Sequence, residues 1–149
     1  MELGRGLVLL PGEGERLQAR GSQMFFKAVS ASTGGRLSLM ERTLPPGGRM
    51  PPPHLHRDRE EAYFVLEGQV AFLVDGQEVI GESGSFVLVP GGVPHTFGNQ
   101  GLVQARLLVI HVPGLDGYFR ELQALWAGAA PPEPAQEREL MARHGMEPA

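Results

Sequence analysis

The sequence predicts an all-β fold in which antiparallel strands form a sandwich or a barrel. Short segments of apolar, aromatic and β-branched residues follow one another between residues 24 and 112. Gly, Pro and Asp residues punctuate these segments and mark turns. No helical pattern lies between them, and this absence disfavours a parallel sheet with crossover helices. Many short strands joined by turns therefore indicate an antiparallel sandwich or barrel.

Length and composition indicate one soluble domain. The 149 residues can bury roughly two-thirds of the surface that the unfolded chain exposes. The chain has no Cys, which excludes disulfides, thiolate metal sites and a cysteine nucleophile. The formal net charge is −4 with both signs interspersed, so we expect no nucleic-acid partner. Glu2 and the short apolar run at residues 7–10 do not suit a signal peptide or a membrane span, so we expect a cytoplasmic protein with no membrane partner.

The chain divides into three parts. Residues 1–23 have few periodic apolar positions, and we expect an N-terminal extended arm with one short strand at residues 7–10. We expect the barrel over residues 24–112 and a C-terminal helical extension over residues 113–149. The strands predicted within the barrel cover residues 24–30, 37–44, 62–66, 69–74, 78–80, 85–89, 95–98 and 105–112.

A tight hairpin turn is predicted at Asp75-Gly76. These two residues separate the segments that end at Val74 and begin at Gln77. Asp-Gly favours a type I′ turn, because both central residues must adopt positive φ. The strands at residues 69–74 and 78–80 should therefore be neighbours.

One or two helices follow the last strand. Asp116 can act as the N-cap of a helix over residues 117–127 that carries an apolar stripe at helical spacing. The Pro-rich residues 128–134 connect it to a second helix over residues 135–144, which Gly145 stops. Packing is the expected role of the stripe, whose residues are Tyr118, Phe119, Leu122, Leu125 and Trp126.

Two central strands are apolar on both faces. Residues 63–66 and 107–110 contain no polar side chain apart from the Tyr63 hydroxyl, although a half-exposed antiparallel strand would alternate apolar with polar residues. One explanation is that the N-terminal arm or the C-terminal helix covers the barrel. The other, which we favour, is that an outer sheet face forms a homodimer interface.

The stretch from Gly48 to Gly68 contains three metal-ligand residues. His54 and His56 are two residues apart, so both imidazoles leave the same face of one strand. Glu61 cannot share that face on an unbroken strand, so residues 57–59 should form a turn that redirects its carboxylate. Imidazoles with a carboxylate suit a first-row transition metal.

A second stretch, from Gly84 to Asn99, supplies a further imidazole. His95 follows a turn that contains Pro and Gly residues, and it is the natural fourth ligand. The first stretch has the spacing G-x5-H-x-H-x4-E-x6-G, and the second has G-x5-P-x-G-x2-H-x3-N. The remaining candidate, His111, lies alone on an apolar strand, and we interpret it as a structural histidine.

These two patterns match the signature motifs of the cupin family at each fixed position, and the chain therefore resembles the cupins. The resemblance implies a double-stranded β-helix, or jelly-roll, barrel with one metal ion bound by His54, His56, Glu61 and His95. Spacing to Gly68 selects Glu61 over Glu60, which should face outward. The tract before the first motif and the segment after the last strand are also similar to cupins of the quercetin 2,3-dioxygenase-like subgroup.

The resemblance implies a divalent transition metal, which would be Fe, Mn, Ni, Co, Cu or Zn, with one or two open coordination positions. We expect a metal-dependent, dioxygenase-like enzyme that acts on a small enol or hydroxy-carbonyl substrate such as a flavonol. Glu61 is the candidate catalytic base, and the candidate substrate wall consists of Tyr63, Phe72, Phe86 and Phe97. Two alternatives are a non-catalytic cupin that binds a small molecule and a metal-assisted isomerase or lyase.

Overall fold

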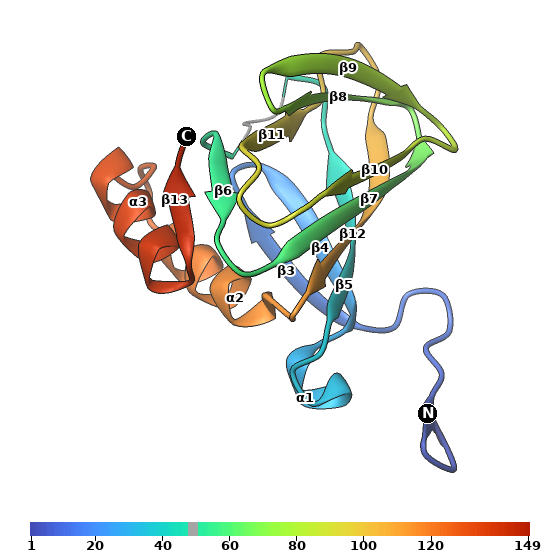
Figure 1. Cartoon of the computed structure of the whole chain (residues 1–149). Helices are drawn as coiled ribbons and strands as arrows, with labels where there is room; N and C mark the ends of the chain where they lie inside the picture. The colour runs from blue at the N-terminus through green and yellow to red at the C-terminus, as the bar shows by residue number, and fades with distance from the viewer. Residues whose placement is uncertain (48–50) are drawn as a thin grey trace.

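The computed structural model of the chain describes residues 1–47 and 51–149. Gly48, the first glycine of the first motif, lies outside the described residues. Two antiparallel sheets face each other and form a jelly-roll barrel (Figure 1). The all-β class predicted from the strand pattern is confirmed.

The larger sheet has six strands in the order β10-β7-β12-β5-β4-β3. Its central strands alternate strictly between buried and more exposed residues, as expected when one face covers the core. In order across the sheet, these strands are β10 (Phe86–Val89), β7 (Glu60–Glu67), β12 (Ala105–Val112), β5 (Ser38–Leu44), β4 (Ser22–Ala28) and β3 (Glu15–Ala19).

The smaller sheet has five strands in the order β13-β6-β11-β8-β9. Strands β8 and β9 meet at Asp75-Gly76, where φ is 49° and 77°, so the predicted type I′ geometry is confirmed. In order across the sheet, these strands are β13 (Met146–Pro148), β6 (His54–His56), β11 (His95–Gly98), β8 (Gln69–Val74) and β9 (Gln77–Glu82).

The described helices are short and lie outside the barrel. The N-terminal hairpin and helix α1 lie at one end of the molecule, away from α3 and β13 (Figure 1). None of the described helices has the length and hydropathy that a bilayer crossing requires. These remaining elements are β1 (Glu2–Leu3), β2 (Gly6–Leu7), α1 (Ser30–Thr33), α2 (Asp116–Leu125) and α3 (Pro134–Arg143).

The C-terminal segment covers one side of the barrel. Helices α2 and α3 and strand β13 lie together beside β6 (Figure 1). Tyr118, Phe119 and Leu122 of the predicted stripe are buried, whereas Leu125 and Trp126 are partly buried. The stripe therefore packs against the barrel core, as predicted.

Several local predictions were wrong. Residues 15–19, expected in an extended arm, form β3, and the strand expected at residues 7–10 is only the two-residue β2. Residues 146–148 form β13, which we did not expect. Both β3 and β13 lie at sheet edges, where the neighbouring strand supplies the hydrogen-bond partners that a weak local pattern cannot. The division of the chain at residues 23 and 112 stays a prediction.

Asp116 is the first residue of α2 rather than its N-cap, which is Leu115. Its carboxylate accepts hydrogen bonds from the amide and hydroxyl of Ser30 at 2.9 and 2.7 Å and from Arg120 at 2.7 Å. Burial opposes ionisation of this carboxyl, but the two Ser30 donors and Arg120 outweigh burial and lower the pKa of Asp116. Asp116 therefore joins α2 to the α1 segment.

This geometry predicts a pH-dependent effect of Asp116→Asn. Since the folded pKa lies below its ordinary value of 3.8, the carboxylate stabilises the fold above that value, and the contribution is lost as pH falls through the folded pKa. At pH 7 the variant should lose about 1–3 kcal/mol of unfolding free energy relative to wild type. Urea unfolding at neutral pH and near pH 3 should show the difference shrinking with acidity. Glu15→Gln, which removes the exposed partner of Arg120, is the control and should change little.

Candidate metal centre

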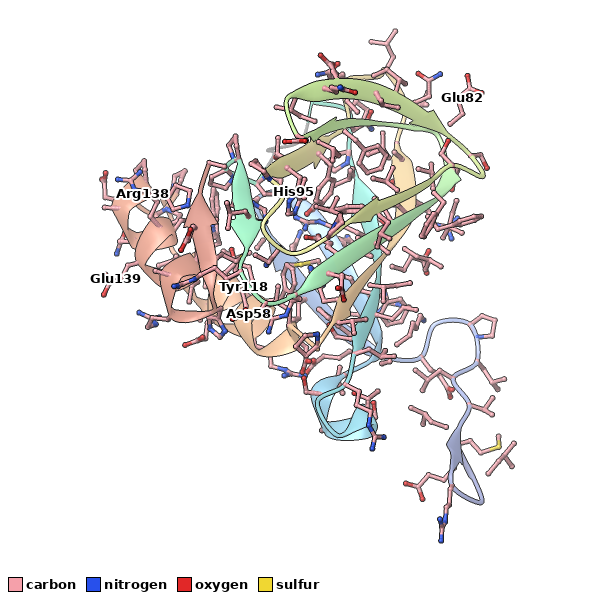
Figure 2. All side chains as sticks on the ribbon, in the orientation of Figure 1. Asp58, Glu82, His95, Tyr118, Arg138 and Glu139 are labelled. Atoms are coloured by element: carbon pink, nitrogen blue, oxygen red, sulfur yellow. The ribbon has the colours of Figure 1, made fainter. Side chains whose placement is uncertain are left out.

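Four buried side chains converge inside the barrel. They are His54 and His56 on β6, Glu61 on β7 and His95 on β11. One ligand atom from each lies within 4.8 Å of the others. His95 lies between the two sheets, whereas Glu82 and Glu139 lie on the outside (Figure 2). The set expected from the two motifs is therefore assembled in one place.

The chain path explains why residues on both sheets meet here. Strand β6 belongs to the smaller sheet and β7 to the larger one, so residues 57–59 carry the chain across the barrel, as the odd spacing of Glu61 required. In the smaller sheet, His95 pairs directly with His54. The amide of Gly92 also donates to the carbonyl of His56 at 2.7 Å. Glu60 is exposed, as predicted from its spacing.

Hydrogen bonds orient all four candidate ligand side chains. His56 Nε2 and His95 Nε2 lie 2.9 and 2.8 Å from the same oxygen, Oε2 of Glu61. The outward ring atoms Nδ1 of His54 and His95 donate to backbone carbonyls of Pro52 and Val93, at 2.7 and 2.9 Å. These carbonyl contacts direct Nε2 of both rings inward, as in protein metal sites.

The charge states of the four side chains also suit a cation. Burial opposes ionisation of Glu61, but facing imidazoles, that of His111 first, lower its pKa well below the ordinary range. Burial lowers the pKa of His54 to about 4 and also lowers that of His56, so both rings are neutral. At His95, burial lowers the pKa, but the Glu61 carboxylate outweighs burial and raises the pKa of this ring. The set thus holds one carboxylate and at least two neutral imidazoles.

The donor set therefore fits a single divalent transition metal. Three imidazoles and one carboxylate are oxygen and nitrogen donors of the kind that such metals bind. Nδ1 of His56 is buried and has no hydrogen-bond partner among the described residues, so no contact there opposes ring adjustment around a cation. A bound cation would replace the ring protons that now point from His56 and His95 at Glu61.

His111 contacts the site, which sequence reasoning missed. Its Nε2 lies 3.1 Å from Oε1 of Glu61, and its side chain is buried. Strands β12 and β7 pair His111 directly with Glu61. The sequence placed His111 on the same strand face as Leu107 and Val109, but only the pairing of two distant strands shows its partner. His111 holds the carboxylate oxygen that the other imidazoles leave free.

A small cavity adjoins the ligands. Its volume is about 20 Å³, which is enough for one water molecule. Of the expected aromatic wall, Phe97 lines this cavity, whereas Phe86 is 62% exposed and was wrongly included. Tyr63 and Phe72 are buried with ring centroids 5.1 Å apart and belong to the core behind it. The C-terminal segment closes the cavity with Leu115, Tyr118, Phe119, Met141 and Met146, and two guanidinium groups, those of Arg20 and Arg42, also line it.

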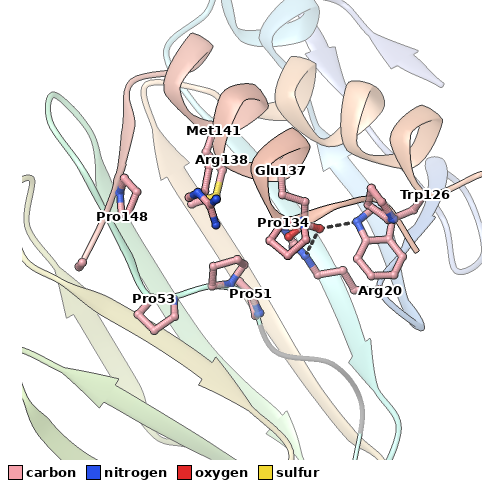
Figure 3. Close-up of a pocket in the computed structure, with 12 residues that line it drawn as sticks. Arg20, Pro51, Pro53, Trp126, Pro134, Glu137, Arg138, Met141 and Pro148 are labelled. Carbon is pink, nitrogen blue, oxygen red and sulfur yellow. Dashed lines mark hydrogen bonds and ion pairs between the residues drawn. The ribbon is translucent and has the colours of Figure 1, made fainter. Parts of the chain in front are cut away.

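A larger pocket of about 550 Å³ lies on the other side of this C-terminal cover. Pro51 and Pro53 line one side of it and Met141 and Arg138 of α3 another (Figure 3). The two cavities share the lining residues Arg20, Pro51 and Met141. These side chains therefore separate the outer pocket from the metal ligands.

Comparisons with known proteins agree with the fold. Residues 40–111 match the family described as Cupin domain. A quercetin 2,3-dioxygenase of Bacillus subtilis is 31% identical over 116 residues, which cover 77% of this chain and 34% of that protein. A germin-like protein of Arabidopsis thaliana is 35% identical over 103 residues, which cover 66% of this chain and 46% of that protein. The chain thus spans about a third to a half of the length of these two curated relatives.

Solved structures share the architecture at lower identity. A protein described as a predicted oxalate decarboxylase from Thermotoga maritima superposes with a TM-score of 0.64 and 23% identity, covering 72% of this chain and 99% of that one. A putative sugar phosphate isomerase from Acidithiobacillus ferrooxidans gives a TM-score of 0.56 and 24% identity, covering 68% and 69% of the two chains. Both likenesses show the fold alone.

Proposed function

This chain belongs to the cupin family, and from that membership and the geometry of its centre we propose that it is a metal-dependent oxygenase for a small enol or hydroxy-carbonyl substrate. The buried group of His54, His56, Glu61 and His95 beside a closed cavity is the observation that carries the proposal. The similarity to a quercetin 2,3-dioxygenase supports the reaction class. Because only a third of that relative is covered, its substrate is not transferred directly.

A divalent metal held by these four residues would offer open positions to the substrate and acidify a hydroxyl bound there. Glu61 is the proposed base, since its carboxylate is ionised and lies at the centre of the ligand set. His111 would hold Oε1 of Glu61 in place during proton transfer. The C-terminal cover would exclude bulk water from the deprotonated substrate.

The closed cavity limits the size of the substrate. Pockets for drug-sized ligands, a class that includes flavonols, measure roughly 300 Å³ or more. The cavity of about 20 Å³ reaches such a size only if it joins the outer pocket of about 550 Å³. Movement of the shared Met141, a flexible side chain, is the simplest way to join them. Turnover of a flavonol therefore requires that the C-terminal cover open.

An oxygen-consumption assay tests the proposal. The metal-free protein is loaded separately with Fe, Mn, Ni, Co, Cu and Zn, and oxygen uptake and substrate absorbance are followed with a flavonol and with small hydroxy-carbonyl compounds. We expect uptake with at least one metal. If none of the metals supports oxygen uptake with any of these compounds, oxygenation is rejected.

A metal-assisted isomerase or lyase is the second candidate. The small cavity favours it, because such a reaction needs no space for dioxygen beside the substrate. Turnover that persists without oxygen would select this candidate. Saturable binding without turnover under either condition would instead select a non-catalytic binding protein.

We also propose that the protein forms a homodimer through the outer face of β10, β7 and β12. Phe64 is 40% exposed and Phe86 62% exposed, and the two are paired across β7 and β10. On the other side, Phe64 pairs with Leu108 of β12. Leu88, which is 53% exposed, continues this row. A contiguous apolar patch of this kind on a sheet is typical of an interface.

This dimer predicts a mass twice the 16.1 kDa of one chain in light scattering after gel filtration. Phe86→Glu should convert the dimer to the monomer, because a carboxylate would be buried against apolar residues. Val79→Glu is the matched control, since Val79 is 56% exposed on β9 of the other sheet. A wild-type protein that is monomeric at every accessible concentration would contradict the proposal.

A further inference from the structure

Arg42 is a buried cation in a position where a barrel strand normally carries an apolar side chain. It belongs to the inward row of β5, together with Met40 and Leu44. It is 2% exposed, and it lines the small cavity together with three of the four metal-ligand residues. Its guanidinium also lies over the ring of Phe97, 5.2 Å from the centroid.

No carboxylate pairs with Arg42 among the residues that the structure describes. Its Nε and Nη2 both donate to Oγ of Ser22, at 3.1 and 3.0 Å. No hydrogen bond from Nη1 to a described residue is present, so Nη1 and the second N–H of Nη2 have no such partner. A buried charge without a counter-charge is costly, and burial, then the nearby Arg20, lowers the pKa of Arg42 to about 10. A buried group of this kind needs an explanation, and a bound ion or ligand is one.

Arg20, the second guanidinium of the cavity, differs because its charge is already balanced. Its Nε donates to Glu137 at 3.0 Å and its Nη2 to the Tyr118 hydroxyl at 3.1 Å. Glu137 lies between Arg20 and Trp126 in Figure 3 and contacts both. Of the two guanidinium groups among the described lining residues, Arg42 is therefore the one without a carboxylate partner.

A bound divalent cation would increase this imbalance. Glu61 carries one negative charge, which balances only half of the charge of the cation, and its Oε1 also lies 3.1 Å from Nε2 of His111. The cavity would then hold an excess of positive charge behind a closed cover. A substrate that brings negative charge would be favoured over a neutral one of the same shape.

We propose that the substrate is a small hydroxy- or oxo-carboxylic acid whose carboxylate binds Arg42 while its hydroxyl or oxo oxygen takes the open metal position. The proposal rests on the proposed function, because it assigns the second oxygen to the metal. Arg42 suits a carboxylate, since a guanidinium held by Ser22 presents parallel N–H donors to two oxygens. The cavity of about 20 Å³ holds only one water molecule, so an acid of this class also needs the C-terminal cover to open, and the shortest acids need the smallest opening.

A pair of probes tests the proposal on the unaltered protein. Glycolate carries a carboxylate and a hydroxyl, and glycolamide is its neutral counterpart of the same shape. With the protein loaded with Co(II), we expect glycolate to change the visible spectrum of the metal and to bind at least about tenfold more tightly than glycolamide. Equal affinities for the two probes, or tighter binding of inorganic phosphate than of glycolate, would overturn the carboxylate assignment.

Variants assign the effect to Arg42. Arg42→Gln should retain the Co(II) spectrum but lose at least about tenfold in glycolate affinity, and Arg42→Lys should lose less, because the charge remains. Arg138→Gln is the control, since Arg138 lines only the outer pocket. Unchanged glycolate affinity in Arg42→Gln would overturn the proposal.

The two proposals fail separately. If the protein binds no metal, the proposed function is rejected, and calorimetry of glycolate against glycolamide on the metal-free protein still tests Arg42. On the metal-free protein, tighter binding of glycolate than of glycolamide supports the carboxylate site at Arg42. Equal binding of the two probes overturns that site. If an Arg42 variant does not fold, the comparison of glycolate with glycolamide on the wild-type protein tests the proposal instead.

Discussion

Replacing Glu61 by Gln is expected to weaken divalent-metal binding by about 100-fold or more. Glu61 is the one carboxylate of the ligand set, and its Oε2 lies 2.9 and 2.8 Å from His56 and His95. The amide that replaces it has no charge to offset the cation in a buried site, and loss of one buried charge partner typically costs about 3–5 kcal/mol. Calorimetric titration of metal into the apoprotein measures the affinity, and elemental analysis gives the stoichiometry.

Glu60→Gln is the matched control, because it makes the same chemical change one residue earlier in β7. Glu60 is exposed on the opposite face of the strand, so the variant should bind metal like wild type. Wild-type affinity in Glu61→Gln, or a comparable loss in Glu60→Gln, would show that the ligand assignment is incorrect. The same pair distinguishes a ligand role from a general effect of net charge.

Leu122→Ala is expected to lower the free energy of unfolding by about 2–5 kcal/mol. Leu122 is fully buried, and together with Tyr118 and Phe119 it packs α2 against the barrel core. Removing its side chain leaves a cavity between the helix and the barrel that the surrounding residues fill only partly. Urea unfolding followed by circular dichroism measures the change. Because the same helix closes the metal cavity, metal should also dissociate faster from the variant.

Leu102→Ala serves as the control for Leu122→Ala. Leu102 is 96% exposed, so its truncation should change the unfolding free energy by less than about 0.5 kcal/mol. If Leu122→Ala cost less than about 1 kcal/mol, α2 would not be packed against the barrel as the structure describes.

Local sequence signals predicted the barrel strands well where turn residues bound them on both sides. Strand β8 runs between Gly68 and Asp75, and its predicted and observed bounds agree. Gly68 has a φ of 73°, and a Cβ there would lie 2.6 Å from the carbonyl oxygen of Gln104. A turn that requires Gly can therefore be recognised from the sequence without knowledge of the fold.

The unexpected strands also have turn glycines beside them, Gly14 and Gly21 at β3 and Gly145 before β13, but their own residues are weak strand formers. Strand β3 has the sequence ERLQA and β13 the sequence MEP, and neither has a strong strand pattern. Each is an edge strand that forms on a neighbour, β3 on β4 and β13 on β6. Their hydrogen bonds depend on a partner that the local sequence does not contain.

The position of Arg42 in the candidate site is another feature that the local sequence does not predict. Neighbouring positions Glu41 and Arg42 place one charge on each face of β5, so the alternation alone did not tell which face points inward. The structure places Arg42 inside and Glu41 towards Arg106 on the outer face. A buried guanidinium beside the candidate metal ligands, without a carboxylate partner among the described residues, is the result.

The sequence by itself determined the all-β class, because turn residues are local properties of the chain, and its resemblance to the cupins predicted the four candidate metal ligands. Only the tertiary structure decided that His111 contacts Glu61, that Arg42 lines the metal cavity and that the C-terminal segment closes it. These features join residues far apart in the chain, such as Arg20 and Glu137 or His56 and Met146. They depend on strand pairing and helix packing, which no local pattern specifies.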